Sequence, residues 1–535
     1  MTADVIIVGG GPNGLMLACE LSLAGISPIV LEQLPQPSTE PKANGLLGQV
    51  VRLADHRGLY EPLSGSPEPP QPNSAYFMFA AMGLDLGLLD ASPVFGLAAP
   101  QHRIVEVLEE RARTLGVDLR RGYRVGSVAQ DEEAVTLDVT GPDGDQQLRA
   151  RYVVGADGAR SVIRKLSGIG FPGVSYDRRT NRTAHATVPA NWVDPVNGAL
   201  TVPGHGPVLP FLPHRTDRGG FSYAPFPGRP PLVSTTEWDQ PATDEPMTLA
   251  EMEASIRRVL GVDLPLGPPD GAGPHVLRRL NGGNTRVADR FRDRRVLLVG
   301  DAAHVYTSGG GPGLNLGLQD AANLGWKLAA ALRGTAPAGL LDSYDTERRQ
   351  AARRMVLNAE AQSALTAPGS DTTALRELFT ELLTRMEVVQ HLADLTAGTD
   401  VRYEMGITDP HPAVGYFAPE LELITGDGKV RLAELARNAR PLLIDLTEDQ
   451  SLAAVLAKDQ DAVDVVIARD SGPAGLSGLL MRPDGYVAWA CGSPCPAPAE
   501  PAALQTAVER WFTVRAAVSG HAVESGRHCG GMDLL

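Results

Sequence analysis

Two glycine-rich segments of the chain have the residue types and spacing of loops that bind anions. The first, GGGPNG, fits the pattern G-x-G-x-x-G with Gly9, Gly11 and Gly14. In such a loop the first glycine makes a tight turn, the second lets a pyrophosphate approach the backbone, and the third allows the following helix to pack closely. Because free amides at the start of that helix face the phosphates, we expect a nucleotide phosphate here.

An acidic residue downstream of this loop supports the nucleotide interpretation. Glu32 ends the apolar run SPIVLE, 18 residues after Gly14, and Gln33 follows it. A carboxylate at this place accepts a hydrogen bond from an adenosine ribose hydroxyl, and its charge repels a 2′-phosphate. The alternative is an ordinary strand-helix-strand turn with a surface glutamate.

Two further turns follow apolar runs. RYVVGADGARS brings Asp157 to the end of an expected strand, and RVLLVGDAAH brings Gly300 and Asp301 to the end of another. Ligands of α/β proteins collect at the carboxyl ends of strands, so these turns are candidates for the same site. Taken alone, Asp-Gly is a common turn, and an isolated Asp301 is also typical of a helix N-cap.

The second glycine-rich segment, GGGPGLNLG, contains Gly311, Gly313, Leu314 and Asn315 and leads into a long helical pattern. Free amides and the positive end of the dipole at such a helix start stabilise a negative charge, the dipole by about 0.3–2 kcal/mol. The apolar and small residues that follow at helical spacing predict a buried helix.

Composition bounds the kind of protein that carries these loops. The chain has 535 residues, 43% hydrophobic and 21% charged, with a net charge of -15. The length favours three or four domains, and the negative charge argues against nucleic acid as a partner. Four cysteines do not make a disulfide framework, and the histidines form no metal signature. With no basic leader and no long apolar stretch, we expect a cytoplasmic protein without a membrane span.

Changes in composition and in expected secondary structure along the chain predict a division into three domains. Residues 1–174 and 275–398 have strand-helix alternation and then mainly helix, which we assign to one discontinuous nucleotide-binding domain. Residues 175–274 are rich in proline and turn signals and predict an antiparallel sheet. Residues 399–535 form a third unit with short apolar strands and a closing helix.

The order and spacing of the three turns resemble the class A flavin-dependent aromatic hydroxylases, of the para-hydroxybenzoate hydroxylase type. The resemblance covers essentially the whole chain and is greatest with hydroxylases of aromatic polyketide pathways. It implies an α/β fold: a Rossmann-like FAD-binding domain of the glutathione-reductase type, an inserted β-sheet substrate domain and a thioredoxin-like C-terminal domain. We interpret that C-terminal unit as packing or oligomer surface, because Cys491 and Cys495 lack the spacing of a thioredoxin redox pair.

The resemblance also implies roles for single residues. The first loop and Asn13 hold the FAD pyrophosphate, Glu32 the adenosine ribose and Asp301 the ribityl chain. Asp157 contacts both FAD and the reduced nicotinamide, and the backbone of Leu314 and Asn315 faces the flavin ring. The complete set of expected FAD contacts is Gly9, Gly11, Asn13, Gly14, Glu32, Gln33, Lys42, Gln101, Val125, Asp157, Gly300, Asp301, Gly311, Gly313, Leu314 and Asn315.

The chain departs from the family pattern at several positions. Lys42 and Gln49 stand where arginines are usual, and Thr307 and Ser308 stand where a proline is common. Lys42 can meet a phosphate as a point charge but lacks the bidentate fork of arginine. Thr307 and Ser308 call into question the geometry that is usual on the side of the flavin that reacts with oxygen.

The chemistry implied by the resemblance is oxygen transfer. NADPH or NADH docks transiently and reduces FAD, O2 adds to give a flavin hydroperoxide, and one oxygen passes to a bulky polycyclic aromatic substrate of polyketide type. A Baeyer-Villiger or epoxidising reaction is the alternative, and a non-enzymatic binding protein on the same fold is a more remote one. The sequence names no catalytic base and leaves a homo-oligomer open.

Candidate substrate contacts are aromatic side chains of the inserted sheet and its surroundings. Their alternative interpretation is ordinary packing in a core. The residues selected are Phe77, Phe211, Tyr223 and Trp238, together with Ser308.

Overall fold

A parallel sheet at the centre of the first unit positions the three turns. The computed structural model describes residues 2–40, 42–241, 243–307, 312–459, 461–470, 475–492 and 499–513. In the sheet the strands follow the order β20 (Arg292–Asp293), β21 (Val296–Leu298), β10 (Gly144–Gly155), β1 (Thr2–Val8), β2 (Ile29–Glu32) and β7 (Asp118–Arg121). The pairs from β21 to β7 are parallel, so their carboxyl ends lie along one edge. Two antiparallel strands, β8 (Arg124–Gln130) and β9 (Val135–Gly141), extend β10.

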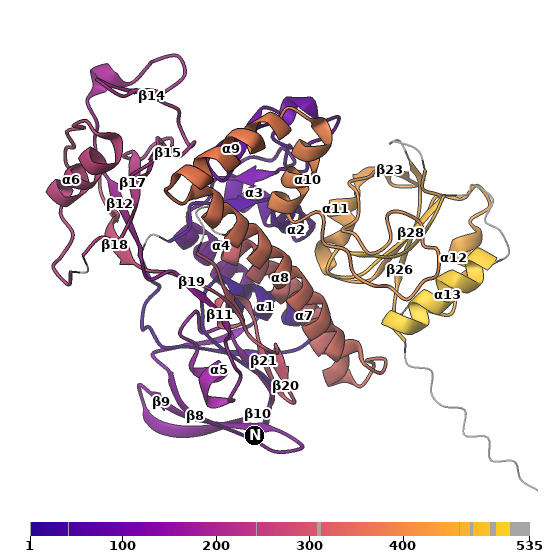
Figure 1. Ribbon diagram of the computed structural model, residues 1–535. Helices are drawn as coiled ribbons and strands as arrows, with labels where there is room; N and C mark the ends of the chain where they lie inside the picture. The colour runs from indigo at the N-terminus through magenta and orange to yellow at the C-terminus, as the bar shows by residue number, and fades with distance from the viewer. Residues whose placement is uncertain are drawn as a thin grey trace, which may run out of the picture.

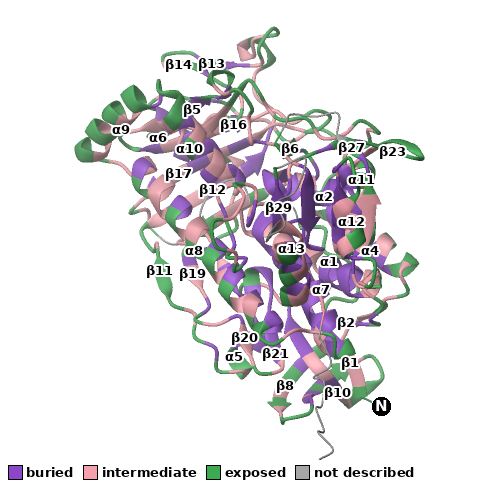
Figure 2. Cartoon of the chain, turned by 90° about the vertical axis from the view of Figure 1, so that its right-hand side faces the viewer, coloured by how far each residue is buried: buried purple, intermediate pink, exposed green. Residues whose placement is uncertain are grey.

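Three long helices pack with this sheet in the main core. They are α1 (Pro12–Leu23), α4 (Gln101–Thr114) and α7 (Pro312–Arg333). The central strands β1 and β21 and the end of β10 have apolar runs because helices and loops cover them, and the residues of these runs are buried (Figure 2). Gly325 lets α7 approach α1 closely, since a Cβ atom there would lie 2.5 Å from the Cβ of Glu20.

The inserted unit is an antiparallel sheet with one helix on one face (Figure 1). Because side chains alternate between the faces of a strand, Phe221, Tyr223 and Val233 share the face that packs on α6, and their neighbours share the other. The strand order is β15 (His214–Thr216), β16 (Gly219–Ala224), β17 (Leu232–Trp238), β12 (Arg179–His185) and β18 (Leu277–Asn281), and the helix is α6 (Leu249–Leu260).

The structure adds one detail to the predicted domain division. β18 pairs with β12 although it lies beyond residue 274, where we place the end of the inserted domain. We therefore propose that the chain leaves this sheet after Asn281. Short strands form small sheets beside the two large ones. A three-stranded sheet lies where the chain passes between the units and contains β11 (Gly173–Ser175), β19 (Asn284–Val287) and β22 (His304–Val305). The first unit also has the pairs β3 (Leu46–Leu47) with β6 (Gly96–Leu97) and β4 (Tyr76–Phe79) with β5 (Met82–Asp85), and the inserted unit has the pair β13 (Leu200–Val202) with β14 (Gly206–Val208).

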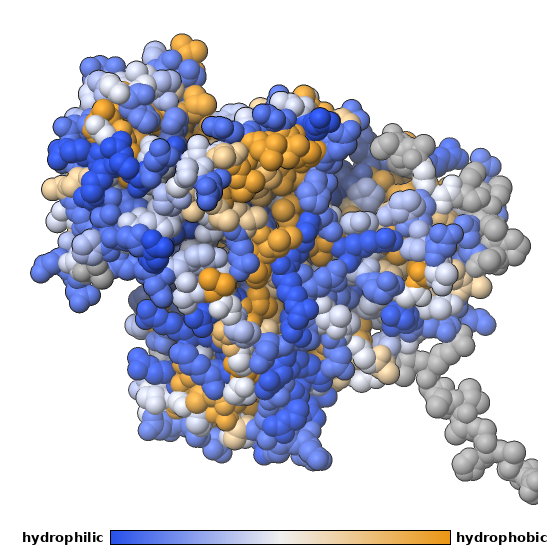
Figure 3. Space-filling model, in the orientation of Figure 1, coloured by the Kyte–Doolittle hydropathy of each residue, from blue (hydrophilic) through white to orange (hydrophobic). Residues whose placement is uncertain are grey.

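Further helices, among them the 27-residue α8, complete the first unit. They are α2 (Gln49–His56), α3 (Tyr60–Ser64), α5 (Val162–Leu166), α8 (Leu340–Thr366), α9 (Ser370–Leu382) and α10 (Met386–Ala397). No residue of α9 is buried, and its Leu375, Leu378 and Leu382 form an apolar stripe where Figure 3 shows an orange patch over that helix. None of the helices in the described ranges combines the length and the apolar character needed to cross a bilayer.

The C-terminal unit has a mixed four-stranded sheet, consistent with the thioredoxin-like fold expected. Its order is β26 (Asp464–Ile467), β25 (Leu442–Asp445), β28 (Gly478–Met481) and β29 (Val487–Cys491), and only the β25–β26 pair is parallel. A second small sheet contains β23 (Glu422–Thr425), β24 (Gly428–Arg431) and β27 (Arg469–Asp470). The helices are α11 (Leu432–Leu435), α12 (Ser451–Val455) and α13 (Ala499–Trp511).

Buried charges fix this unit against α7 and α8. The guanidinium of Arg482, which has no exposed surface, pairs with Glu347 of α8 and with Asp484. Lys327 of α7 donates to the same Glu347 carboxylate at 2.7 Å. Aromatic rings surround the arginine, including that of Trp511 at 4.6 Å. Leaving any one of these charges without its partner would cost several kcal/mol, on the order of 3–5, so the network specifies how the units dock.

Candidate active site

The predicted turns meet at the carboxyl edge of the parallel sheet. Because β2, β1, β10 and β21 are successive neighbours, Glu32, the first glycine loop, Asp157 and Asp301 follow one another along that edge. Backbone hydrogen bonds hold the loops together: Gly9 donates to the carbonyl of Leu31 at 2.7 Å. The arrangement is that of a nucleotide site in a Rossmann-like domain.

The three glycines of the first loop differ in what a side chain would meet at each position. A Cβ atom on Gly9 would lie 2.3 Å from the carbonyl oxygen of Ala156, and its φ of 116° also requires glycine. A Cβ atom on Gly14 would lie 2.0 Å from the carbonyl oxygen of Gly9. At Gly11 none of the described residues, its own chain neighbours aside, has an atom within 4 Å of that position. Two glycines thus close the loop, and the third leaves its Cα side open toward the described part of the chain.

Glu32 reaches back to the glycine loop. One carboxylate oxygen accepts from the amide of Gly10 at 2.7 Å and the other from the amide of Leu34 at 2.8 Å. These bonds fix the carboxylate at the end of β2, beside the loop. Gln33 is exposed next to it.

Asn13 lies between the first loop and the turn after β21. Its Nδ2 atom is 1.9 Å from the position that a Cβ atom on Gly300 would take, and 2.4 Å from the same position on Gly317. Its Oδ1 atom is buried and has no hydrogen-bond partner among the described residues. An orphaned buried acceptor is costly, which fits a ligand that donates to it.

Asp157 shows the same feature. One of its carboxylate oxygens accepts from the amides of Val162 and Ile163, at 2.6 and 3.0 Å, at the start of α5. The other is buried and without a partner in the described part of the chain. One oxygen of the carboxylate therefore caps the helix, and the other is available to a ligand.

Asp301 meets the second glycine-rich segment. Its Oδ1 atom lies 3.1 Å from where a Cβ atom on Gly313 would be, so glycine permits this approach. The residue keeps access to solvent, yet the protein packed around the carboxyl raises its pKa, an effect that His304 and Lys42 oppose. Lys42 also pairs with Glu40 at 3.5 Å.

The start of α7 faces a small pocket. Pro312 and Asn315 line a cavity of about 80 Å³ together with Leu47 and Phe77. The Oδ1 atom of Asn315 accepts from the amide of Leu47 at 3.3 Å. The first amides of a helix have no intrahelical acceptor, so those of Gly313 and Leu314 are donors available at this site. Gly311 and Ser308 lie outside the described residues.

Two other predicted cofactor contacts, Gln101 and Val125, lie on α4 and β8. Gln101 begins α4 and donates its amide to the carbonyl of Ala43, next to Lys42. Val125 is 6% exposed in β8 and packs in the main core, so only its backbone is available to a ligand.

The predicted substrate contacts separate into two groups. Phe77 lines the pocket beside α7, and Trp238 lies on the face of the inserted sheet opposite α6. Phe211 is exposed in the loop before β15, with its ring 5.2 Å from that of Phe226. Tyr223, in contrast, is 2% exposed in the core under α6, where packing alone accounts for it. The parity of β16 puts it there, because Tyr223 is two residues from buried Phe221.

Comparisons with known proteins agree with this geometry. Residues 2–359 match the family model described as "FAD binding domain", and residues 411–514 match "Aromatic-ring hydroxylase, C-terminal". The chain belongs to the FAD-dependent aromatic hydroxylases.

Individual relatives cover nearly the whole hydroxylase. It is 40% identical to a 12-dehydrotetracycline 5-monooxygenase/anhydrotetracycline 6-monooxygenase of Streptomyces rimosus, over 91% of this chain and 95% of the relative. The solved structure of OxyS anhydrotetracycline hydroxylase from Streptomyces rimosus matches with a TM-score of 0.82 and 38% identity, over 96% of this chain and all of that one. A dialkyldecalin synthase of Streptomyces rugosporus is 35% identical over 96% of this chain and 99% of its own length.

Sequence reasoning missed one buried group of the hydroxylase. Asp320, on α7, has no exposed surface and accepts from the amide of Gly300 at 3.0 Å and from His304 at 2.7 Å. The available signal was an acid in the helical series of small and apolar residues that includes Gly313, Gly317 and Leu324. His304, which follows the turn, is structural in this arrangement. No group of three or more possible metal ligands occurs in the described ranges.

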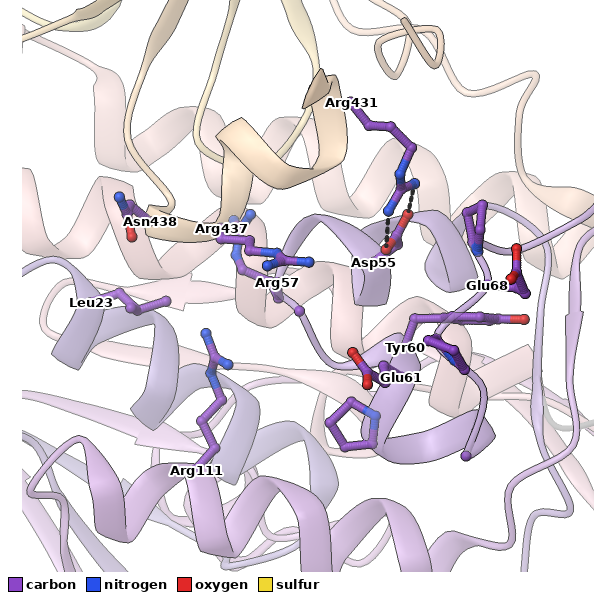
Figure 4. Close-up of a pocket in the computed structure, with 15 residues that line it drawn as sticks. Leu23, Asp55, Arg57, Tyr60, Glu61, Glu68, Arg111, Arg431, Arg437 and Asn438 are labelled. Atoms are coloured by element: carbon purple, nitrogen blue, oxygen red, sulfur yellow. Dashed lines mark hydrogen bonds and ion pairs between the residues drawn. The ribbon is translucent and has the colours of Figure 1, made fainter. Parts of the chain in front are cut away.

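A larger pocket of about 620 Å³ lies elsewhere, between the FAD-binding unit and the C-terminal unit (Figure 4). Arg111 and Arg437 point into it, and Arg431 pairs with Asp55 at 2.7 Å. Leu23, the last residue of α1, also lines it, and the length of this helix separates it from the glycine loop by about 18 Å. The carbonyl ends of α1, α2 and α4 meet near this pocket, so the arginines complement helix dipoles there.

Proposed function

We propose that this FAD-dependent monooxygenase uses NADPH or NADH and O2 to hydroxylate a polycyclic aromatic substrate of polyketide type. One observation carries the cofactor site. The side chains of Asn13 and Asp157, and the open space at Gly11, face one sheet edge, with two buried oxygens that await a donor.

The residues present fit FAD, and we assign each part of the cofactor to a group of them. The first loop and the amide group of Asn13 hold the pyrophosphate, Glu32 the adenosine ribose and Asp301 the ribityl chain. The orphaned Oδ1 atom of Asn13 accepts from a hydroxyl group of the cofactor, because the pyrophosphate itself has no proton to donate. The amides of Gly313 and Leu314 donate to the flavin ring, where the positive helix end stabilises negative charge. When bound, FAD supplies the redox chemistry: it accepts a hydride and activates dioxygen.

The protein contributes position and exclusion of water to the reaction. We assign the aromatic substrate to the region between the pocket of Phe77 and the open face of the inserted sheet. That open face carries hydroxyl and amide groups: Thr236 donates to Asn181 at 2.8 Å, and Ser234 to Thr183 at 3.3 Å. Such a surface suits an aromatic skeleton with an oxygenated edge. Named relatives that act on anhydrotetracycline support the same substrate class.

Two other reactions are compatible with the same site. A Baeyer-Villiger or epoxidising reaction would use the same cofactor and oxygen. The likeness to a dialkyldecalin synthase favours, as a second candidate, a ring-forming activity on a polyketide substrate.

The product distinguishes these functions. The purified protein should be yellow, with absorbance near about 450 nm, and should oxidise NADPH or NADH faster when polycyclic phenols are added. A phenolic product that gains one oxygen atom supports hydroxylation. A lactone points to Baeyer-Villiger chemistry, and a product of unchanged mass without nicotinamide oxidation points to the ring-forming reaction.

A further inference from the structure

A ring of mostly buried contacts, made of hydrogen bonds, one pair of stacked tyrosines and short runs of backbone, connects the turns of the proposed flavin seat with the C-terminal unit. It begins at Asp320, whose Oδ2 atom accepts from the amide of Gly300 at 3.0 Å. Gly300 has a φ of 60°, and Asn13 fills the space above its α-carbon. The position of the Gly300–Asp301 turn is thus set from one side by Asn13 and from the other by Asp320.

Arg348 of α8 takes the second oxygen of Asp320. Its Nε atom donates to Oδ1 of Asp320 at 2.7 Å, and its Nη2 atom to the carbonyl of Leu316 at 3.1 Å. Leu316 lies in the first turns of α7, so one guanidinium joins the start of α7 to the Gly300–Asp301 turn, which it reaches through Asp320. Burial by itself would raise the pKa of Asp320, but the charges and hydrogen bonds of His304 and Arg348 hold it below its ordinary value.

The ring continues toward the C-terminal unit through two tyrosines. Nη1 of Arg348 donates to the hydroxyl of Tyr403 at 2.5 Å. The ring of Tyr403 stacks on that of Tyr486, with centroids 4.1 Å apart. Tyr486 belongs to the turn before β29 and is 3% exposed.

The last link returns to the flavin seat. The Nε2 atom of Gln49 donates to the hydroxyl of Tyr486 at 2.9 Å. Two residues earlier, the amide of Leu47 donates to Asn315 at the start of α7. The C-terminal unit, through Tyr486, therefore bridges two segments of the FAD-binding unit, and both of them hold the same seat.

We propose that Asp320 is a positioning residue for the flavin and that the ring through Arg348, Tyr403 and Tyr486 makes FAD affinity depend on the C-terminal unit. This inference rests on the FAD seat assigned under the proposed function. Asp320 acts through the backbone of Gly300. Tyr486 of the C-terminal unit supplies the hydroxyl that accepts from Gln49 of the FAD-binding unit.

The test measures FAD affinity of the full-length apoprotein by flavin fluorescence, beside the thermal midpoints of the apoprotein and the holoprotein. Asp320→Asn should weaken FAD binding at least tenfold, because the turn at Gly300 loses its anionic anchor. Tyr403→Phe keeps the stacked ring but removes the acceptor of Arg348, and should weaken FAD binding about three- to tenfold. In both variants the gain in thermal midpoint on adding FAD should shrink.

Asp55→Asn is the matched control. Asp55 pairs with Arg431 at the same interface between units but has no contact with the ring. It should bind FAD as the unchanged protein does, even where its thermal midpoint falls. Equal loss of FAD affinity in Asp55→Asn and Tyr403→Phe would overturn the proposal, because general docking would then explain both. So would lowered midpoints in Asp320→Asn and Tyr403→Phe with unchanged FAD affinity.

Failure of this inference can be told apart from failure of the proposed seat. Asp301→Asn changes the seat without touching the ring. If Asp301→Asn weakens FAD binding and the ring variants do not, the seat stands and the coupling fails. If none of the three weakens it, the seat itself is wrong and the coupling falls with it.

Discussion

The side-chain nitrogen of Asn13 lies 1.9 Å from the position that a Cβ atom on Gly300 would occupy. Gly300→Ala must therefore displace Asn13, and it must also hold alanine at a φ of 60°. We expect a loss of about 1–3 kcal/mol in stability, together with a large loss of FAD affinity. Thermal unfolding of the apoprotein and a flavin titration measure the two effects.

Gly11→Ala should separate binding from folding. Gly11 has a φ of -78°, and within the described ranges no residue apart from its chain neighbours lies within 4 Å of the position of its missing Cβ. The apoprotein should keep its stability to within about 1 kcal/mol, the scale of a glycine-to-alanine change at an N-cap. FAD affinity should fall at least tenfold, because the methyl group takes the space of the pyrophosphate. Unchanged FAD affinity in this variant would contradict the assignment of the loop.

Asp301→Asn should raise the stability of the apoprotein slightly and lower its affinity for FAD. The folded protein raises the pKa of this carboxyl, so at pH values above that pKa the chain must hold an ionised group that its surroundings disfavour. Because the unfolded chain ionises at a lower pH, this cost grows as the pH rises through the interval between the two pKa values. At neutral pH the variant apoprotein should melt slightly higher than the parent, and its FAD affinity should be about tenfold lower. Differential scanning fluorimetry with and without FAD gives both readings, and a lower apoprotein midpoint would contradict this account.

Glu347→Gln should change the acid stability of the protein. Arg482 and Lys327 hold the pKa of Glu347 far below its ordinary value of 4.5, although burial alone would raise it. For a carboxylate with a depressed pKa, the stabilisation is complete above pH 4.5 and is lost as the pH falls toward the folded value. The variant should be about 3–5 kcal/mol less stable at pH 7, because two buried cations lose a partner. Its stability should also decline less steeply below pH 4.5 than that of the parent, which urea unfolding at a series of pH values will show.

Two adjacent threonines of β17 should behave differently. Thr236 faces the open side of the inserted sheet and donates to Asn181, whereas Thr235 is 1% exposed and bonds Ser255 of α6 at 2.7 Å. Thr236→Val should raise the KM for a polycyclic phenol about three- to tenfold with FAD affinity unchanged. Thr235→Val should lower stability by about 1 kcal/mol and leave KM alone. If only the Thr235 variant had a raised KM, the substrate would lie on the α6 side of the sheet, and its assignment to the open face would be wrong.

Local sequence patterns were enough to predict that the turns of the candidate site lie at one edge of the sheet. The glycine loop, Glu32 and the Asp157 and Asp301 turns all follow apolar strands, and parallel strands must bring their carboxyl ends to one edge. The requirements on Gly9 and Gly14 are also local, since they arise within one strand-turn-helix unit. Fold class and cofactor class follow from such short-range rules.

Other features depended on contacts between distant segments. Tyr223 was a candidate substrate contact, but strand register and α6 put it in a core. The importance of Gly300 and Gly317 lies in a side chain, Asn13, that is hundreds of residues away in sequence. Nothing near Tyr486 indicates that its hydroxyl meets Gln49.

The sequence by itself therefore predicted a nucleotide site and the turns that would form it, because glycine spacing and strand ends encode these within a few residues, and the resemblance to a known family named FAD as the nucleotide. Only the tertiary structure decided which face each side chain takes and which buried polar groups pair across units. The physical reason is that the cost of a buried charge such as Asp320 on α7 depends on donors supplied together by the turn after β21, by β22 and by α8.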